Sequence, residues 1–284
     1  MSSADLALAR PCYPGAFWRL YKGEMSLLVR RRRNLALLGV LSVIPLIIGI
    51  AVYLSTPRGG EGPAFLGQIT GNGLFLVFTA LTVSLPVFLP LVVGVVAGDS
   101  IAGEAGLGTL RYLLTVPVTR SRLLAAKTLG VATFTALAVL VVALVGLTAG
   151  AILFGLGDVT LLSGDTVGIG QGLLRALGVA AYVVVALFGL AAGGVFISTL
   201  TENAIAAMAT TIGIVVLSAL LDAVPQLSAI HPWLLTHNWL GFGELLRSNV
   251  DSGALLRWSG IHLAYAAGFL SLAWVRLQTK DITS

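Results

Sequence analysis

The stretch RRRRNLALLGVLSVIPLIIGIAVYL, residues 30–54, decides the fold. Its last twenty residues, Leu35–Leu54, contain no Asp, Glu, Lys or Arg. A helix of that length crosses the ~30 Å hydrocarbon core of a bilayer. Four consecutive arginines precede it, and such clusters flank membrane spans on the cytoplasmic side. The stretch therefore predicts a membrane-spanning helix that enters the bilayer from the cytoplasm.

Further apolar stretches indicate that this span is one of six. Those long enough to cross the bilayer are Leu74–Gly98, Thr128–Gly157, Ala176–Thr201, Asn203–Leu221 and Trp258–Val275. Pro86 and Pro90 are expected to bend the first of these, because each proline removes a helix hydrogen bond. Only 10% of the 284 residues are charged, whereas a soluble domain carries roughly 25%. We predict an all-α polytopic membrane protein, with residues 1–284 forming a single transmembrane domain.

The distribution of the 17 Lys and Arg residues predicts the orientation. Seven precede the first span, four lie between the second and third, and two follow the last. With both termini in the cytoplasm, these thirteen lie inside and four lie outside, as the positive-inside rule requires. We expect a multi-pass protein of the cell membrane whose basic residues face lipid headgroups rather than nucleic acid.

Three segments lie outside the predicted spans. Residues 15–33 mix aromatic, leucine and basic residues, which favours an interfacial helix on the inner leaflet, although a simple basic flank has the same composition. Residues 99–122 form the one sizeable cytoplasmic loop. Residues 222–257 are too polar to span and are rich in Pro, Trp and Leu, so we expect short extracytoplasmic helices there.

The cytoplasmic loop carries the most informative motif. It lies within GDSIAGEAGLGTLRYLLTVPVTRSRLLAAK, residues 98–127: an acidic entry, a short amphipathic helix near Thr109–Leu114, a proline break and a basic return to the membrane. This segment resembles the ABC-2-type permease family, the membrane subunits of one class of ATP-binding cassette exporter. The family pattern is an acidic residue, Gly-Thr-Leu, Leu-Leu-Thr-x-Pro, an Arg and a downstream Lys. It falls here on Glu104, 108–110, 113–117, Arg120 and Lys127.

The resemblance implies a coupling helix between spans two and three that docks on a separate ATPase subunit. The residues it implicates in ATPase coupling are Glu104, Gly108, Thr109, Leu110, Arg111, Leu113, Leu114, Pro117 and Arg120. It also implies a second permease, either another copy or a related chain, and ATP with Mg²⁺ bound on the partner subunit. An ordinary basic loop obeying the positive-inside rule is the plainer alternative.

We expect this chain to bind no cofactor or metal and to catalyse no reaction itself. Gly-Lys, which a Walker A loop requires, occurs nowhere in it. His231 and His237 lie beside Trp233 and Trp239 and are interpreted as interfacial residues rather than metal ligands. His262 is the one histidine within a predicted span. A functional role in the bundle interior and simple snorkelling to the outer boundary are both open for it.

Two other classes of function compete with an exporter subunit. An ion-coupled secondary transporter usually needs ionisable residues within its spans, and the six predicted spans lack Asp, Glu, Lys and Arg. An intramembrane enzyme needs a catalytic set, and none is recognisable. Glycine pairs four residues apart at Gly94/Gly98, Gly146/Gly150 and Gly189/Gly193 are candidates for close helix packing, although 34 glycines make such spacings common by chance. The sequence does not indicate the transported substrate.

Overall fold

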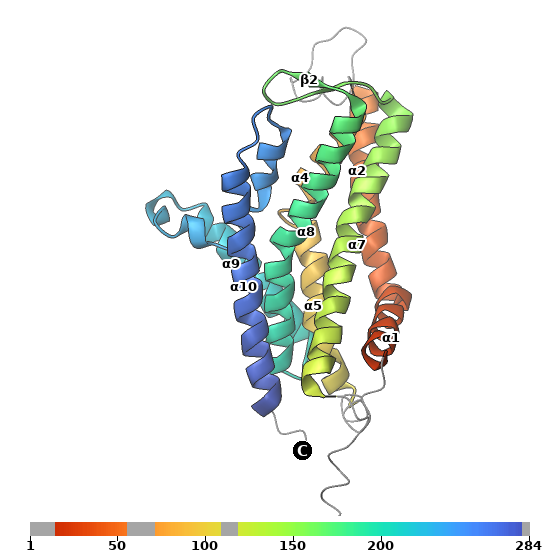
Figure 1. The fold of residues 1–284 in the computed structure, drawn as a ribbon. Helices are drawn as coiled ribbons and strands as arrows, with labels where there is room; N and C mark the ends of the chain where they lie inside the picture. The colour runs from red at the N-terminus through yellow and green to blue at the C-terminus, as the bar shows by residue number, and fades with distance from the viewer. Residues whose placement is uncertain (1–14, 56–71, 109–118, 280–284) are drawn as a thin grey trace, which may run out of the picture.

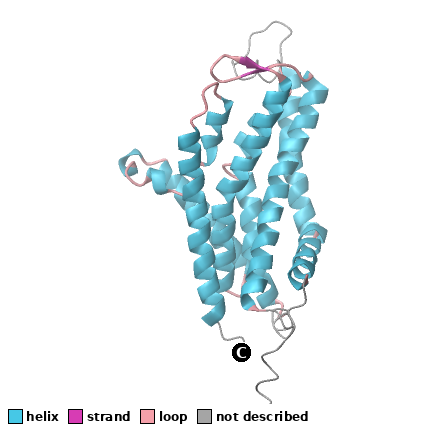
Figure 2. Cartoon of the chain, in the orientation of Figure 1, coloured by secondary structure: helices cyan, strands magenta, loops and turns pink. Residues whose placement is uncertain are grey.

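The computed structural model describes residues 15–55, 72–108 and 119–279. Long helices run side by side and form most of these residues (Figures 1 and 2). The elements in chain order are α1 (Ala16–Arg30), α2 (Arg32–Ser55), α4 (Leu74–Ser84), α5 (Phe88–Gly106), α7 (Arg120–Phe154), β1 (Val159–Thr160), β2 (Thr166–Val167), α8 (Ile169–Leu200), α9 (Ala204–Asp222) and α10 (Ser252–Thr279).

Six helices of the described part of the chain are long and apolar enough to cross a membrane: α2, α5, α7, α8, α9 and α10. The architecture is therefore that of an all-α polytopic membrane protein, as predicted. The antiparallel β1–β2 pair between α7 and α8 was not predicted, because strands of two residues leave no recognisable pattern.

The bundle has two distinct ends (Figure 1). At one end lie α1, the start of α7 and the last turn of α10; we call this the basic end, because it carries Arg30–Arg33, Arg120, Arg122 and Arg276. At the other lies the β1–β2 pair, and we call this the hairpin end. There Asn72 accepts a bond from the Leu74 amide (2.9 Å) and donates to the carbonyl oxygens of Gly157 (2.7 Å) and Asp158 (3.0 Å).

A separate helix precedes the first span, as the sequence predicted. The break between α1 and α2 falls at Arg31, whose backbone is extended (φ −65°, ψ 120°). On α1, Trp18 and Leu27 are more than half exposed while Glu24 is buried, so the helix has one face toward the bundle and one away from it. The bundle-facing side packs against α7.

The predicted second span is two helices rather than one bent helix. α4 ends at Ser84, and α5 begins at Phe88. Pro86 lies in the break, and Pro90 lies in the first turn of α5, where a missing amide hydrogen costs little. α5 then continues through Asp99 to Gly106. Residues 99–106, expected to be the start of the cytoplasmic loop, are therefore helical.

α5 and α8 form the buried centre of the bundle, while most of α2, α9 and α10 is exposed. α8 packs against α4, α5, α7, α9 and α10. The exposed surface of α9 is apolar: Ile205 is 76% exposed, and Leu217 and Leu220 are more than half exposed. Such a surface is stable against lipid tails, which carry no polar groups to match.

The three predicted glycine pairs all lie at close helix contacts. Gly94 and Gly98 face α9, where a Cβ atom on Gly98 would lie 2.7 Å from the Met208 amide nitrogen. The pair Gly146/Gly150 faces the start of α4, and Gly189/Gly193 faces α10. At Gly98 and Gly150 a Cβ atom would collide with the neighbouring backbone, so a side chain there would push the helices apart.

Short 3₁₀ helices occupy the segment between α9 and α10. They run Pro225–Leu227, His231–Trp233 and Trp239–Leu246, as predicted for residues 222–257. The first part of this segment projects sideways from the bundle beside α9 and α10 (Figure 1).

Candidate functional site: a buried ionic cluster at the basic end

Lys127 of α7 is the centre of a buried ionic cluster. Its ammonium group lies 3.1 and 3.2 Å from the two carboxylate oxygens of Glu24 on α1 and 2.8 Å from Oε1 of Glu104 on α5. The three side chains are 1%, 11% and 12% exposed, respectively. An ammonium group has three hydrogens to donate, so one lysine can join three helices in this way.

A second group of charges adjoins the first. Asp99, five residues before Glu104 on α5, forms ion pairs with Arg31 and with Arg33 (2.7 Å) at the break between α1 and α2. The whole cluster thus contains three carboxylates and three cations. A cavity of about 20 Å³ lies between the two groups, which is room for about one water molecule. Mutual pairing allows Glu24, Asp99, Glu104 and Lys127 to be buried, while Arg31 and Arg33 stay partly exposed.

The cluster brackets the predicted coupling segment. The coupling segment falls on residues 109–118, outside the described residues. Glu104 lies four residues before Gly108, the last described residue ahead of this segment. Lys127 lies eight residues after Thr119, the first described residue beyond it. Thr119 caps the start of α7 by accepting a bond from the Arg122 amide. The Glu104–Lys127 pair therefore joins the two stems of the intervening segment, and the Glu24–Lys127 pair joins both stems to α1.

Of the residues predicted to couple to an ATPase, three lie within the described chain. Glu104 is in the cluster. Gly108 adopts a positive φ of 68° just after α5, a conformation that glycine tolerates best. Arg120 is the first residue of α7. The others lie outside the described residues: Thr109, Leu110, Arg111, Leu113, Leu114 and Pro117.

Arg120 makes an intramolecular contact that the sequence did not predict. Its guanidinium donates to the carbonyl oxygens of Leu277 and Gln278, both at 2.9 Å. These carbonyls belong to the last turns of α10, where a cation is favourable. Ser121 also accepts a bond from the Trp274 indole (2.9 Å). Arg120 thus ties the start of α7 to the end of α10, and its role in ATPase coupling stays a prediction.

A buried serine links the cluster to the centre of the bundle. Ser198 of α8 donates to the Gly98 carbonyl oxygen (2.7 Å) and accepts bonds from the amides of Ile101 (2.9 Å) and Ala102 (2.8 Å). In a regular helix the Ala102 amide bonds to the Gly98 carbonyl. The Ser198 hydroxyl bridges these two groups, so α5 is held by α8 between Asp99 and Glu104, the two acidic residues of the cluster.

Sequence reasoning found Lys127 and Glu104 in the motif but missed Glu24, Asp99 and Ser198. The available signal was the placement of Glu24 among apolar and aromatic residues, where an acidic side chain needs a partner. Its partner lies 103 positions away in the chain, and no local pattern identifies a contact at that separation.

His262, the candidate within the membrane, lies in α10 and is fully buried. The snorkelling interpretation is therefore wrong. Neither ring nitrogen has a hydrogen-bond partner among the described residues. Its backbone lies close to α8, because a Cβ atom on Gly189 would approach the His262 carbonyl oxygen to 3.1 Å. It lies on a different pair of helices from the ionic cluster, so the structure does not bring the two candidates together.

The cluster ties α1, α5 and α7 together at one end, and Ser198 extends the connection to α8.

No curated protein matches the chain. Residues 43–283 match the family model described as Protein of unknown function (DUF2705), and the chain belongs to that family.

Proposed function

We propose that this chain is the transmembrane permease subunit of an ATP-binding cassette exporter. It would form the translocation path with a second permease, either another copy or a related chain, and be driven by a separate ATPase subunit. The observation that carries the proposal is the buried bonding of Lys127 to both Glu24 and Glu104, at the two stems of the segment that resembles a coupling loop.

The cluster gives such a loop a way to move the bundle. Pulling one buried charge away from its partner leaves the other uncompensated in a dry environment, which is strongly unfavourable. A force on residues 109–118 would therefore move α1 and the adjoining ends of α5 and α7 together. Ser198 would pass the displacement of α5 to α8, the most central helix.

The proposal also assigns an orientation and partners. The basic end faces the cytoplasm of a cell membrane, in accordance with the positive-inside rule. α1 then lies at the inner leaflet, with Trp18 and Leu27 toward lipid. ATP and Mg²⁺ bind the partner, and this chain catalyses no reaction itself.

An ion-coupled secondary transporter is the second candidate, and the structure supplies one observation in its favour. α5 and α7 extend beyond the charge-free stretches and bring Asp99, Glu104 and Lys127 into buried positions. Buried carboxylates next to a lysine are suitable for binding and releasing a proton. Their location at one end, beside the loop stems, favours the coupling role instead.

The test is whether the chain stimulates ATP hydrolysis by an ATPase. The chain is co-expressed with an ABC-type ATPase subunit from the same organism, purified through a tag on the chain and reconstituted in liposomes. We expect vanadate-sensitive hydrolysis above that of the ATPase alone. Glu104→Gln should reduce this stimulation because one bond to Lys127 is weakened. Lys22→Gln, which removes a charge from the exposed face of α1, is the matched control.

Two results would count against the proposal. Hydrolysis at the same rate with and without the chain would exclude a permease powered by that ATPase. Ion flux through liposomes containing the chain alone, driven by a proton or sodium gradient and lost in Glu104→Gln, would establish the second candidate.

A further inference from the structure

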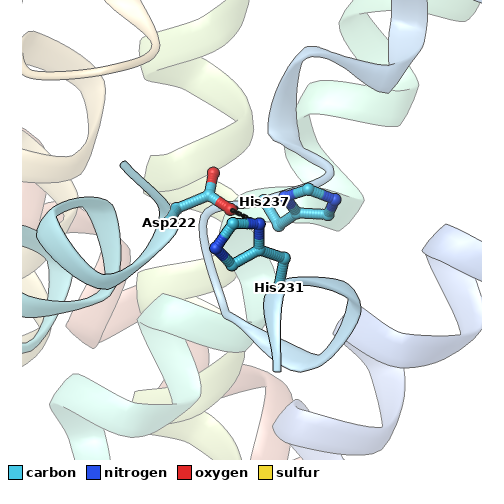
Figure 3. A group of neighbouring side chains, drawn as sticks. All are labelled: Asp222, His231 and His237. Atoms are coloured by element: carbon cyan, nitrogen blue, oxygen red, sulfur yellow. Dashed lines mark hydrogen bonds and ion pairs between the residues drawn. The ribbon is translucent and has the colours of Figure 1, made fainter. Parts of the chain in front are cut away.

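Three potential metal ligands converge beside α9. Asp222 is the last residue of α9, His231 begins a 3₁₀ helix, and His237 lies in the turns that follow. Figure 3 shows the three side chains pointing toward one another. One donor atom from each lies within 4.8 Å of the other two. Both histidines were interpreted as interfacial residues because they lie beside Trp233 and Trp239 in the sequence.

The His231 ring is oriented as a metal ligand would be. Its Nε2 lies 3.1 Å from the Val224 carbonyl oxygen. A carbonyl oxygen can only accept, so Nε2 carries the hydrogen and Nδ1 carries the free lone pair. That Nδ1 lies 3.9 Å from Oδ1 of Asp222. Histidine ligands in metal sites commonly donate their second N–H to a backbone carbonyl in this way, which fixes both tautomer and orientation.

The His237 ring approaches the same carboxylate oxygen. Its Nδ1 lies 2.6 Å from Oδ1 of Asp222, and the two imidazole centroids are 5.7 Å apart. Around a tetrahedral zinc ion with bonds of ~2.0–2.1 Å, donor atoms lie roughly 3.3 Å apart. The three donors thus need shifts below about 1 Å to bind one ion. The side chains of Asp222, His231 and His237 are 28%, 16% and 35% exposed, so they have room for such shifts.

The backbone around the ligands is held in place. Thr236, next to His237, bonds to Ser218 of α9 through both its hydroxyl (2.9 Å) and its amide (3.2 Å). The Tyr265 hydroxyl of α10 donates to the Trp233 carbonyl oxygen. The ligands therefore belong to a segment anchored to both neighbouring helices.

We propose that Asp222, His231 and His237 bind a divalent transition-metal ion of the zinc class, with a fourth position open to water. Imidazole nitrogens select such ions over Mg²⁺ and Ca²⁺, which prefer oxygen ligands. α9 has 19 residues, about 28 Å of helix, so Asp222 reaches the far boundary of the hydrocarbon core when α9 starts at the near one. The ion would join the end of α9 to the segment leading into α10. This inference is independent of the proposed function.

The experiment measures Zn²⁺ binding by the full chain in detergent, purified through a tag without histidine. Competition with a chelator gives the affinity and the stoichiometry. We expect one Zn²⁺ per chain, and a higher thermal midpoint with ZnCl₂ than with MgCl₂. Replacing a ligand should weaken binding by more than the ~10–100-fold seen for loss of a supporting partner. The variants are His231→Asn, His237→Asn and Asp222→Asn. Gln226→Ala, at an exposed position in the same segment, is the control and should bind like the wild type.

Co²⁺ supplies a second readout that does not depend on the variants folding. Bound at this site in the wild-type chain, it should show the intense visible absorption of a tetrahedral complex, and excess Zn²⁺ should remove that absorption. A wild-type chain that fails to retain Zn²⁺ against the chelator would overturn the proposal. So would equal Zn²⁺ affinity in the wild type and the His231→Asn/His237→Asn double variant.

Discussion

Two clusters of ionisable side chains in this molecule differ in how far they are exposed to solvent. At the basic end, Glu24, Glu104 and Lys127 are almost completely buried and joined by direct ion pairs. Beside α9, Asp222, His231 and His237 remain partly exposed, and one ring nitrogen of His231 faces the carboxylate without touching it. The first cluster joins helices and has little room for another group. The second has both the access and the open geometry that a ligand needs.

Removing the lysine from the buried cluster should have the largest effect. Lys127→Met leaves Glu24 and Glu104 buried without their shared cation, and breaking a buried pair in this way costs about 3–5 kcal/mol. We expect that loss in the free energy of unfolding, measured by chemical denaturation in detergent.

One further variant sharpens this first prediction. The triple variant Glu24→Gln/Glu104→Gln/Lys127→Met should recover most of the loss, because no uncompensated charge remains. A Lys127→Met protein as stable as the wild type would mean that the charges are well solvated, and the contrast between the two clusters would fail.

A smaller effect is expected where the buried cluster meets α8. Ser198→Ala removes the hydroxyl that accepts from the Ile101 and Ala102 amides. Leaving buried backbone donors without that acceptor costs about 1–3 kcal/mol. The matched control is Ser42→Ala, since the Ser42 hydroxyl bonds to the Leu38 carbonyl oxygen of its own helix. Equal stability of the two variants would show that Ser198 does not hold α5.

The smallest effect should come from the open cluster in the presence of a chelator. Asp222→Asn weakens a contact with His237 whose side chains are 28% and 35% exposed. Partly exposed pairs of this kind contribute less than about 1 kcal/mol. The same denaturation measurement should show a change within that limit. A loss as large as that of Lys127→Met would remove the distinction between the two clusters.

The sequence predicted those parts of the fold that depend on local composition. Charge-free stretches located the six spans, residue composition indicated a helix before the first span and short helices before α10, and the glycine pairs marked close helix contacts. The end of α5 was predicted too early in the chain and the start of α7 too late. The reason is that Asp99, Glu104 and Lys127 were assumed to lie outside the bundle. Their burial depends on partners that only the fold brings near.

The candidate sites were less accessible to sequence reasoning for the same physical reason. Glu24 and Lys127 come from different helices, and Ser198 reaches α5 from nearly 100 residues away. Asp222, His231 and His237 are neighbours because of tight turns rather than a helical or strand period. For His262, the position near the end of the last span left snorkelling and a place in the bundle interior both open, and the structure buries it completely against α8.

The central proposal is that the segment between Gly108 and Thr119 docks on a separate ATPase and transmits its conformational change to the helices of the bundle. The predicted helix there presents Leu110 and Leu113 on one face, and burying each leucine on a partner contributes ~1.5–3 kcal/mol. The most direct measurement is recovery of the ATPase with the purified chain, at equal membrane abundance. It compares the wild type, Leu110→Ser/Leu113→Ser and the control Leu162→Ser, which changes an exposed leucine at the hairpin end. We predict that the double variant stays in the membrane but loses the ATPase and its vanadate-sensitive hydrolysis, while the control keeps both. Equal ATPase recovery and equal hydrolysis in all three proteins would contradict the account.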